Sequence, residues 1–235
     1  ELDGNLYISE KSAHRVVTLS SDGLPLDEFG QLGVAGDDET HFNNPAGLAV
    51  DAANRLYVAD RDNHRIMVFS SSGTFLQAYG SIGNDDGQFN NPEGVAINPV
   101  NGQIVVADRG NGRVQIFDQS WNWLHTIPAL DAPRDVAVDS QGNVYISDGQ
   151  STVLWKCVWV EASSNYACSV LVGELYSKGE PFFHFQNNVG LGIDSDDRVY
   201  IADQGLGIVY IYDGEGNFYG SLSGLLPLDV TVDAG

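Results

Sequence analysis

Residues 44–80 read Asn44-Pro45-Ala46-Gly47-Leu48-Ala49-Val50-Asp51, Arg55-Leu56-Tyr57-Val58-Ala59-Asp60, His64-Arg65-Ile66-Met67-Val68-Phe69 and Gly73-Thr74-Phe75-Leu76-Gln77-Ala78-Tyr79-Gly80, with short gaps between the runs. Each run is rich in β-branched and aromatic residues, and Asp, Asn, Gly and Ser separate the runs, which is typical of strands joined by hairpin turns. The pattern returns in residues 91–127, 133–148 and 190–212. Four short strands that recur about every 40 to 55 residues predict the blades of an all-β propeller, each blade a four-stranded antiparallel sheet.

The number of blades follows from the acidic residue that ends each second strand. It occurs five times, as Glu10, Asp60, Asp108, Asp148 and Asp203, and no interval between these residues has room for a further blade. We therefore predict five blades, with six as the alternative if a blade was lost from the chain. The chain begins at a second strand, 5–10, and residues 227–233 resemble the missing first strand. Pairing of this C-terminal strand with the N-terminal blade would close the ring and remove an exposed edge, so residues 1–235 are expected to form one domain.

The charge balance is strongly acidic, with 11 Lys and Arg against 32 Asp and Glu and a net charge of −21. Such a surface repels phosphate backbones and anionic lipid headgroups, so we expect no nucleic-acid partner. No apolar run approaches about 18 residues, and membrane insertion is not expected. The first residues do not read as a signal peptide, which suggests a mature or trimmed form, or a trimmed propeller without a function of its own.

Two cysteines, Cys157 and Cys168, flank a turn-rich segment between two strand-like runs. In a hairpin that turns near Ala162-Ser163 they lie opposite one another, which is the geometry of a cross-strand disulfide. The closed loop is short, so the bond is expected to contribute on the order of 3 kcal/mol at most. Two buried free thiols are the alternative. A disulfide favours an oxidising, extracellular or periplasmic location.

The units Pro-x-Gly-Leu-Ala-Val-Asp, Leu-Tyr-Val-Ala-Asp-Arg and Asn-x-Arg-Ile, in residues 42–118 above all, resemble NHL repeats. NHL propellers commonly have six blades, so five would depart from the commonest form. The resemblance implies a functionally mixed family, with protein-binding modules, RNA-binding modules, bacterial sensor domains and one enzyme branch. The fold therefore does not give the function.

The enzyme branch is the peptidyl-α-hydroxyglycine α-amidating lyase, whose repeat is similar to residues 59–66 and 107–115. This resemblance implies a zinc ion held by histidines just before inner strands, inside the central channel. The corresponding positions hold Ala46, Glu93, Arg134 and Leu228, and the position of the lyase's catalytic tyrosine holds Lys11. Only Arg61 and Arg109 match. Three convergent imidazoles, which suit zinc, are therefore absent from these positions.

One face of the ring gathers the starts of the inner strands and the loops after the second strands, around the mouth of the channel. Binding residues concentrate on such loops. The candidate binding residues on this face are Lys11, His14, Arg61, His64, Glu93, Arg109, Arg134, Asp135 and Asp229. The arginines could clamp a carboxylate or phosphate bidentately. The recurring Asp60, Asp108, Asp148 and Asp203 are expected instead to cap their turns through backbone N–H groups, with an arginine paired to a neighbouring acid.

Metal sites are less clearly marked. The histidines His14, His41, His64, His125 and His184 lack the spacing of a metal motif, and the acidic turns 37–39, 84–86 and 194–197 lack the order of a calcium-binding loop. Calcium or zinc in the channel remains open, and no cofactor is certain. Phe42 and Phe185 are expected to pack between blades. No phosphate loop, nucleophile elbow or Cys/His pair is recognisable.

We therefore expect a monomeric recognition module that binds a protein, peptide or small molecule at the mouth of the channel. A metal-dependent propeller lyase or hydrolase is the alternative. Metal content and the lining of the channel distinguish the two.

Overall fold

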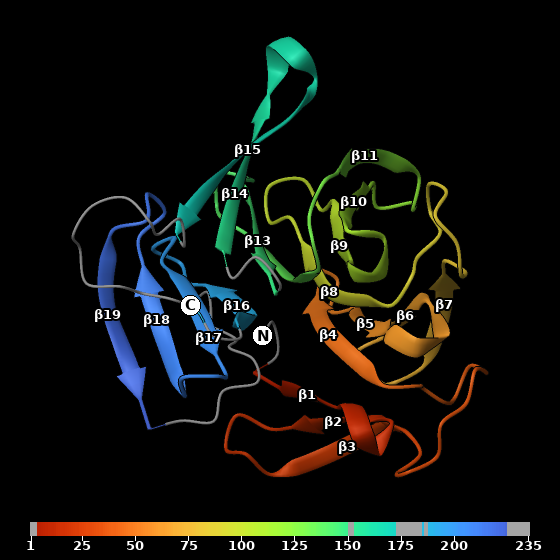
Figure 1. The fold of residues 1–235 in the computed structure, drawn as a ribbon. Coiled ribbons are helices and arrows are strands. Elements are labelled where there is room, and N and C mark those ends of the chain that lie inside the picture. The colour runs from red at the N-terminus through yellow and green to blue at the C-terminus, as the bar shows by residue number, and fades with distance from the viewer. Residues whose placement is uncertain (1–3, 150–152, 173–184, 186–187, 225–235) are drawn as a thin grey trace.

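The computed structural model describes residues 4–149, 153–172, 185 and 188–224. These residues form five antiparallel sheets arranged as the blades of a propeller (Figure 1). The first sheet holds β1 (Leu6–Glu10), β2 (Arg15–Leu19) and β3 (Pro25–Gly30). The second holds β4 (Pro45–Val50), β5 (Leu56–Asp60), β6 (Arg65–Phe69) and β7 (Phe75–Tyr79). The predicted five blades are confirmed.

The other three sheets repeat the four-stranded order. They consist of β8 (Pro92–Ile97), β9 (Ile104–Asp108), β10 (Arg113–Phe117) and β11 (Trp123–Ile127); of β12 (Pro133–Val138), β13 (Val144–Asp148), β14 (Val153–Val160) and β15 (Asn165–Val172); and of β16 (Asn188–Ile193), β17 (Val199–Asp203), β18 (Ile208–Tyr212) and β19 (Phe218–Ser223). In each, consecutive strands pair, as in a meander. The first strand is innermost, because β4 contacts β8, β8 contacts β12 and β12 contacts β16.

The first sheet has three strands among the described residues, and its register shows which one it lacks. Glu10 pairs with Arg15 as Asp60 pairs with Arg65, so β1 is the equivalent of the second strand β5. The strand predicted to complete this sheet, 227–233, lies outside the described residues. Closure by that strand therefore stays a prediction.

The inner strands approach one another closely at the glycine of the Pro-x-Gly motif. A Cβ atom at Gly47 would lie 2.6 Å from the carbonyl oxygen of Glu93, and one at Gly94 would lie 2.7 Å from the Cα atom of Asp135. Both contacts are with backbone of the next blade, which cannot move aside as a side-chain end can. The motif therefore requires glycine because neighbouring blades pack backbone against backbone around the centre.

Apolar side chains between successive sheets form the core. Phe42 and Phe89, just before two inner strands, are fully buried, and Phe185 is 2% exposed. Phe42 packs with Phe69 and Val16 of adjacent blades. Phe185 packs with Tyr210. The expectation that Phe42 and Phe185 pack between blades is confirmed.

The acid that ends a second strand accepts hydrogen bonds from several segments of its blade. Asp60 accepts hydrogen bonds from the backbone N–H of Asn43, the amide of Asn63 and Nε of Arg65, at 2.7 to 2.8 Å. Asp108 has the same three kinds of partner in the next blade. Asp148 accepts from two backbone N–H groups and Asp203 from one. Asp203 caps the turn that follows it, as expected. Asp60 and Asp108 make no side-chain cap bond to the 3-10 turn that follows each of them, and their backbone donors, Asn43 and Asn90, come just before the inner strand.

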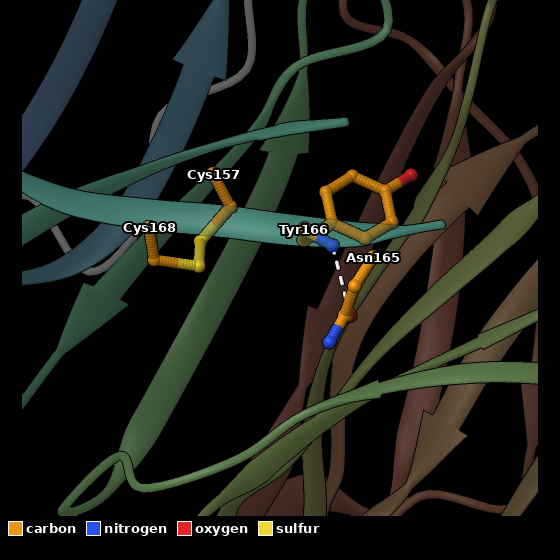
Figure 2. Close-up of a disulfide and its surroundings, with 4 residues drawn as sticks. All are labelled: Cys157, Asn165, Tyr166 and Cys168. Carbon is orange, nitrogen blue, oxygen red and sulfur yellow. Dashed lines mark hydrogen bonds between the residues drawn. A yellow bond between two sulfur atoms is a disulfide. The ribbon is translucent and has the colours of Figure 1, made fainter. Parts of the chain in front are cut away.

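The fourth blade ends in a longer hairpin, β14 and β15, which projects from the ring (Figure 1). Cys157 pairs with Cys168 in the strand register, and a disulfide joins them with a Cα–Cα distance of 4.0 Å (Figure 2). The hairpin turns at Glu161–Ser163, which includes the predicted Ala162-Ser163. Trp159 near its tip packs on His125 of β11, with ring centroids 4.6 Å apart. The predicted disulfide is confirmed.

Among the described residues, no helix has the length and apolar character needed to span a membrane.

Candidate functional site

Two equivalent positions in each blade supply the side chains of the candidate site. The first follows a second strand, where Lys11, Arg61 and Arg109 each begin a short 3-10 turn. The second is the residue after the first residue of an inner strand, which is Glu93 in β8 and Arg134 in β12. Because Pro92 pairs with Asp108 and Pro133 with Asp148, both positions lie at the same edge of their sheets.

Glu93 lies between two of the cations. Its Oε1 atom accepts a hydrogen bond from Nζ of Lys11 at 3.1 Å, and its Oε2 atom lies 3.1 Å from Nε of Arg109. The second contact has the distance of an ion pair but not the alignment of a hydrogen bond. Oε2 of Glu93 and Nε of Arg109 are therefore buried without a hydrogen-bond partner among the described residues. The glutamate is held by charge more than by directed bonds.

Arg61 and Arg134 complete the group. Nη1 of Arg61 donates to Oδ1 of Asp62 at 2.8 Å, and Asp62 is itself fixed by the side-chain amides of Asn44 and Asn91. Nε of Arg61 and Nε of Arg134 are buried and have no hydrogen-bond partner within the described ranges. We refer to Lys11, Arg61, Arg109, Arg134 and Glu93 as the cationic cluster.

The pKa of Arg134 reflects its burial and the nearby charges of Glu93, Arg109 and Arg61. Burial lowers the pKa of Arg134, the negative charge of Glu93 opposes that effect, and the positive charges of Arg109 and Arg61 lower the pKa further. The four cations outnumber the two carboxylates, Glu93 and Asp62, that face them. An anion placed between the guanidinium groups would relieve their mutual repulsion and bond to their unused N–H groups.

Arg134 has room because the fourth blade departs from the pattern of the first three. The residue after Asp148 is Gly149, where the equivalent positions hold Lys11, Arg61 and Arg109. A Cβ atom at Gly149 would lie 2.0 Å from Nε of Arg134 and 2.6 Å from its Cδ atom. Because Gly149 has no side chain, the Cγ, Cδ and Nε atoms of Arg134 can fill this space. Gly149 was not predicted from the sequence, although its departure from the repeat is visible there.

Three of the predicted binding residues have structural partners. Nδ1 of His14 accepts the backbone N–H of Asn44 at 3.2 Å, and Nδ1 of His64 accepts that of Asn91 at 3.1 Å, so each histidine joins its turn to the next blade. Asp135 accepts the backbone N–H groups of Val136 and Leu191 and so connects β12 to β16. Asp229, the remaining candidate, lies outside the described residues. A binding role for this set stays a prediction.

The zinc arrangement implied by the lyase resemblance does not fit the side chains at these positions. Ala46 offers no donor atom and Arg134 offers a cation, while Glu93 is already neutralised by Lys11 and Arg109. Leu228 lies outside the described part of the chain. Within that part, no group of three His, Cys, Asp or Glu side chains is placed to hold a metal ion. The side chains at Ala46, Glu93 and Arg134 therefore suit an anion better than a divalent metal ion.

Comparison with known families and proteins identifies the repeat. The NHL repeat family model matches residues 42–69 and 89–117, which cover most of the second and third blades. Peptidyl-glycine alpha-amidating monooxygenase A of Xenopus laevis is 34% identical over 142 residues, which are 57% of this chain and 15% of that protein. Protein brain tumor of Drosophila melanogaster is 29% identical over 122 residues, which are 51% of this chain and 12% of that protein. The chain thus spans a small part of these relatives.

A solved structure resembles the chain over most of its length. In the nidogen/laminin complex, the matching chain has a TM-score of 0.69 at 16% identity, covering 94% of this chain and 76% of that one. At this identity the likeness supports the propeller fold and no more.

Proposed function

Because the chain is an NHL-repeat β-propeller, we propose that it is a recognition module that binds an anionic group at the cationic cluster. The ligand is a protein, peptide or small molecule that carries a carboxylate or phosphate. The observation that carries this proposal is the convergence of Lys11, Arg61, Arg109 and Arg134 in a chain of net charge −21. Four cations gathered in an acidic protein repel one another, so a ligand anion would stabilise them.

The unused donors give the site its chemistry. Nε of Arg61 and Nε of Arg134 are buried without hydrogen-bond partners among the described residues, while Nε of Arg109 faces Glu93 at 3.1 Å. A guanidinium presents parallel N–H groups that match a carboxylate or phosphate bidentately. Buried polar groups left unpaired cost free energy, and that cost is recovered when a ligand satisfies them. The site is therefore preorganised for a planar or tetrahedral oxyanion.

The ligand is a discrete anion rather than a nucleic acid. A polyanion has to approach along a broad surface, and most of this surface is acidic. A small anion or an acidic side chain reaches the cluster without covering the negative face. We propose a binding role over a lyase or hydrolase, because the positions that would hold zinc carry Ala46, Glu93 and Arg134.

The disulfide supports a proposal for the location of the domain. Cys157–Cys168 is a bond that persists in oxidising surroundings. We propose that the domain works outside the cytoplasm, in an extracellular or periplasmic space, and as a monomer.

Ligand-detected fluorine NMR tests the proposal with 4-fluorobenzoate as the anion and 4-fluorobenzamide as its neutral analogue. The wild-type protein is expected to bind the benzoate at least tenfold more tightly than the benzamide. Arg134→Gln is expected to weaken benzoate binding about 10- to 100-fold, since it removes charge-assisted hydrogen bonds of about 1.5 to 3 kcal/mol.

Arg198→Gln is the matched control, because it removes the same charge from an arginine that pairs with Asp194 and Asp196 in the fifth blade. Its benzoate affinity should equal that of the wild type. Equal binding of benzoate and benzamide, or equal weakening by both substitutions, contradicts the proposal.

A further inference from the structure

The cationic cluster already contains one carboxylate, that of Glu93. It bridges Lys11 and Arg109, with 3.1 Å to each nitrogen, and its side chain is 14% exposed. The Glu93 carboxylate lies beside the cations that would attract a ligand oxyanion, so it competes with the ligand for them. Its presence changes which anions the cluster accepts.

The backbone holds Glu93 in this place. It is the second residue of β8, and the next residue, Gly94, packs against the backbone of Asp135 in β12. On the other side, the carbonyl oxygen of Glu93 lies against Gly47 of β4. Strands on both sides therefore fix the Cα atom, and the carboxylate can move only by side-chain rotation. The contacts with Lys11 and Arg109, at 3.1 Å each, hold the carboxylate in the rotamer that faces the cluster.

The charge count then limits the ligand. Glu93 pairs with Lys11 and Arg109, and Asp62 pairs with one nitrogen of Arg61. Among the described residues, Arg134 is therefore the cation of the cluster with the fewest protein partners. One carboxylate satisfies one guanidinium bidentately. A phosphate monoester carries close to two negative charges at neutral pH, and its second charge meets the Glu93 carboxylate at short range.

We propose that Glu93 is the specificity-determining residue of this site and restricts it to singly charged carboxylates, excluding doubly charged phosphate monoesters. The inference rests on the proposed function, since it requires that the cluster binds anions. The ligand class is accordingly a carboxylate: an acidic side chain, a peptide C-terminus or an organic acid.

Two probes of the same shape test the selectivity: 4-fluorobenzoate and 4-fluorophenyl phosphate, titrated at pH 7.5 by fluorine NMR. The wild type is expected to prefer the benzoate. In Glu93→Gln, Lys11 and Arg109 lose their internal partner and the repulsion disappears, so phosphate binding should rise at least tenfold relative to benzoate. Glu215→Gln is the charge-matched control, because Glu215 is exposed in the turn between β18 and β19, in another part of the ring.

The outcomes separate the two claims. If the wild type binds both probes equally, or if Glu93→Gln and Glu215→Gln give the same ratio of affinities, the inference about Glu93 is wrong while the anion site stands. If neither probe binds to the wild type or to Glu93→Gln, the proposed function itself is wrong. Glu93→Ala, compared with Glu93→Gln by thermal unfolding and by the same titration, distinguishes a loss of folding from a change of selectivity.

Discussion

The side chain of Arg134 fills the space that a side chain at Gly149 would need, because a Cβ atom at position 149 would lie 2.0 Å from Nε of the arginine. The backbone of Gly149 has no left-handed φ that would itself demand glycine. The requirement is therefore steric, and it concerns a side chain of the candidate site rather than the core.

Substitution of Gly149 by Ala should displace Arg134 without altering any charge. The guanidinium stem has to rotate away, so the affinity for 4-fluorobenzoate is expected to fall about fivefold, the loss of roughly one ordinary hydrogen bond. The free energy of unfolding should change by less than about 1 kcal/mol, since the arginine end is flexible. Fluorine NMR and urea unfolding measure the two quantities. Unchanged affinity in a folded G149A protein would remove Arg134 from the site.

Gly94 faces backbone atoms as well as the Asp135 side chain, whose Oδ1 atom would lie 2.6 Å from an added Cβ, so Gly94→Ala is expected to be far more damaging. The added Cβ would lie 2.7 Å from the Cα atom of Asp135 and 2.9 Å from the carbonyl oxygen of Arg134, and two inner strands would have to separate. We expect a loss of about 2 kcal/mol or more in the free energy of unfolding. Gly220→Ala in β19 is the control, because nothing lies within 4 Å of its Cβ position. Equal stability of the two variants would argue against close packing of the inner strands.

His64 supports the next blade by accepting the N–H of Asn91. His64→Asn should lower the free energy of unfolding by about 1 kcal/mol, because that donor loses its partner while asparagine tolerates the left-handed backbone at φ 57°. The affinity for 4-fluorobenzoate should stay within about twofold of wild type. A variant of normal stability but reduced affinity would instead make His64 a ligand contact, as the sequence analysis predicted.

The disulfide should contribute measurably to stability. Reduction of Cys157–Cys168 is expected to lower the free energy of unfolding by up to about 3 kcal/mol, because the closed loop no longer restricts the unfolded chain. Urea unfolding with and without dithiothreitol measures the change. The double variant Cys157→Ala, Cys168→Ala serves as control, since its stability should not respond to the reductant. A wild-type protein equally indifferent to reduction would show that the bond does not stabilise the domain.

The sequence predicted those features that depend on local pattern and repetition. The strands, the turns and the acids that end the second strands, such as Asp60 and Asp108, recur from repeat to repeat, and the hairpin register placed Cys157 opposite Cys168. Arg61 and Arg109 were located because they occupy the same position of two repeats. The face on which they lie followed from the order of the strands.

The features it missed depend on contacts between blades. The space beside Gly149, the position of Glu93 between Lys11 and Arg109, and the acceptor role of Nδ1 in His14 and His64 arise from residues far apart in the chain. A repeat pattern says which residues share a position in a blade, and it does not say how two blades meet. The hydrogen bond by which Asp135 joins β12 to β16 was also not foreseen, and its predicted binding role stays a prediction.

Binding of an anion at the cationic cluster is tested most directly by a crystal structure of the wild-type protein soaked with 4-bromobenzoate, in which bromine locates the probe by anomalous scattering. We expect a carboxylate with its oxygens within about 3 Å of the Arg134 guanidinium, on the edge that carries Arg61 and Arg109. A well-occupied probe elsewhere on the protein, with the cationic cluster unchanged, would contradict it.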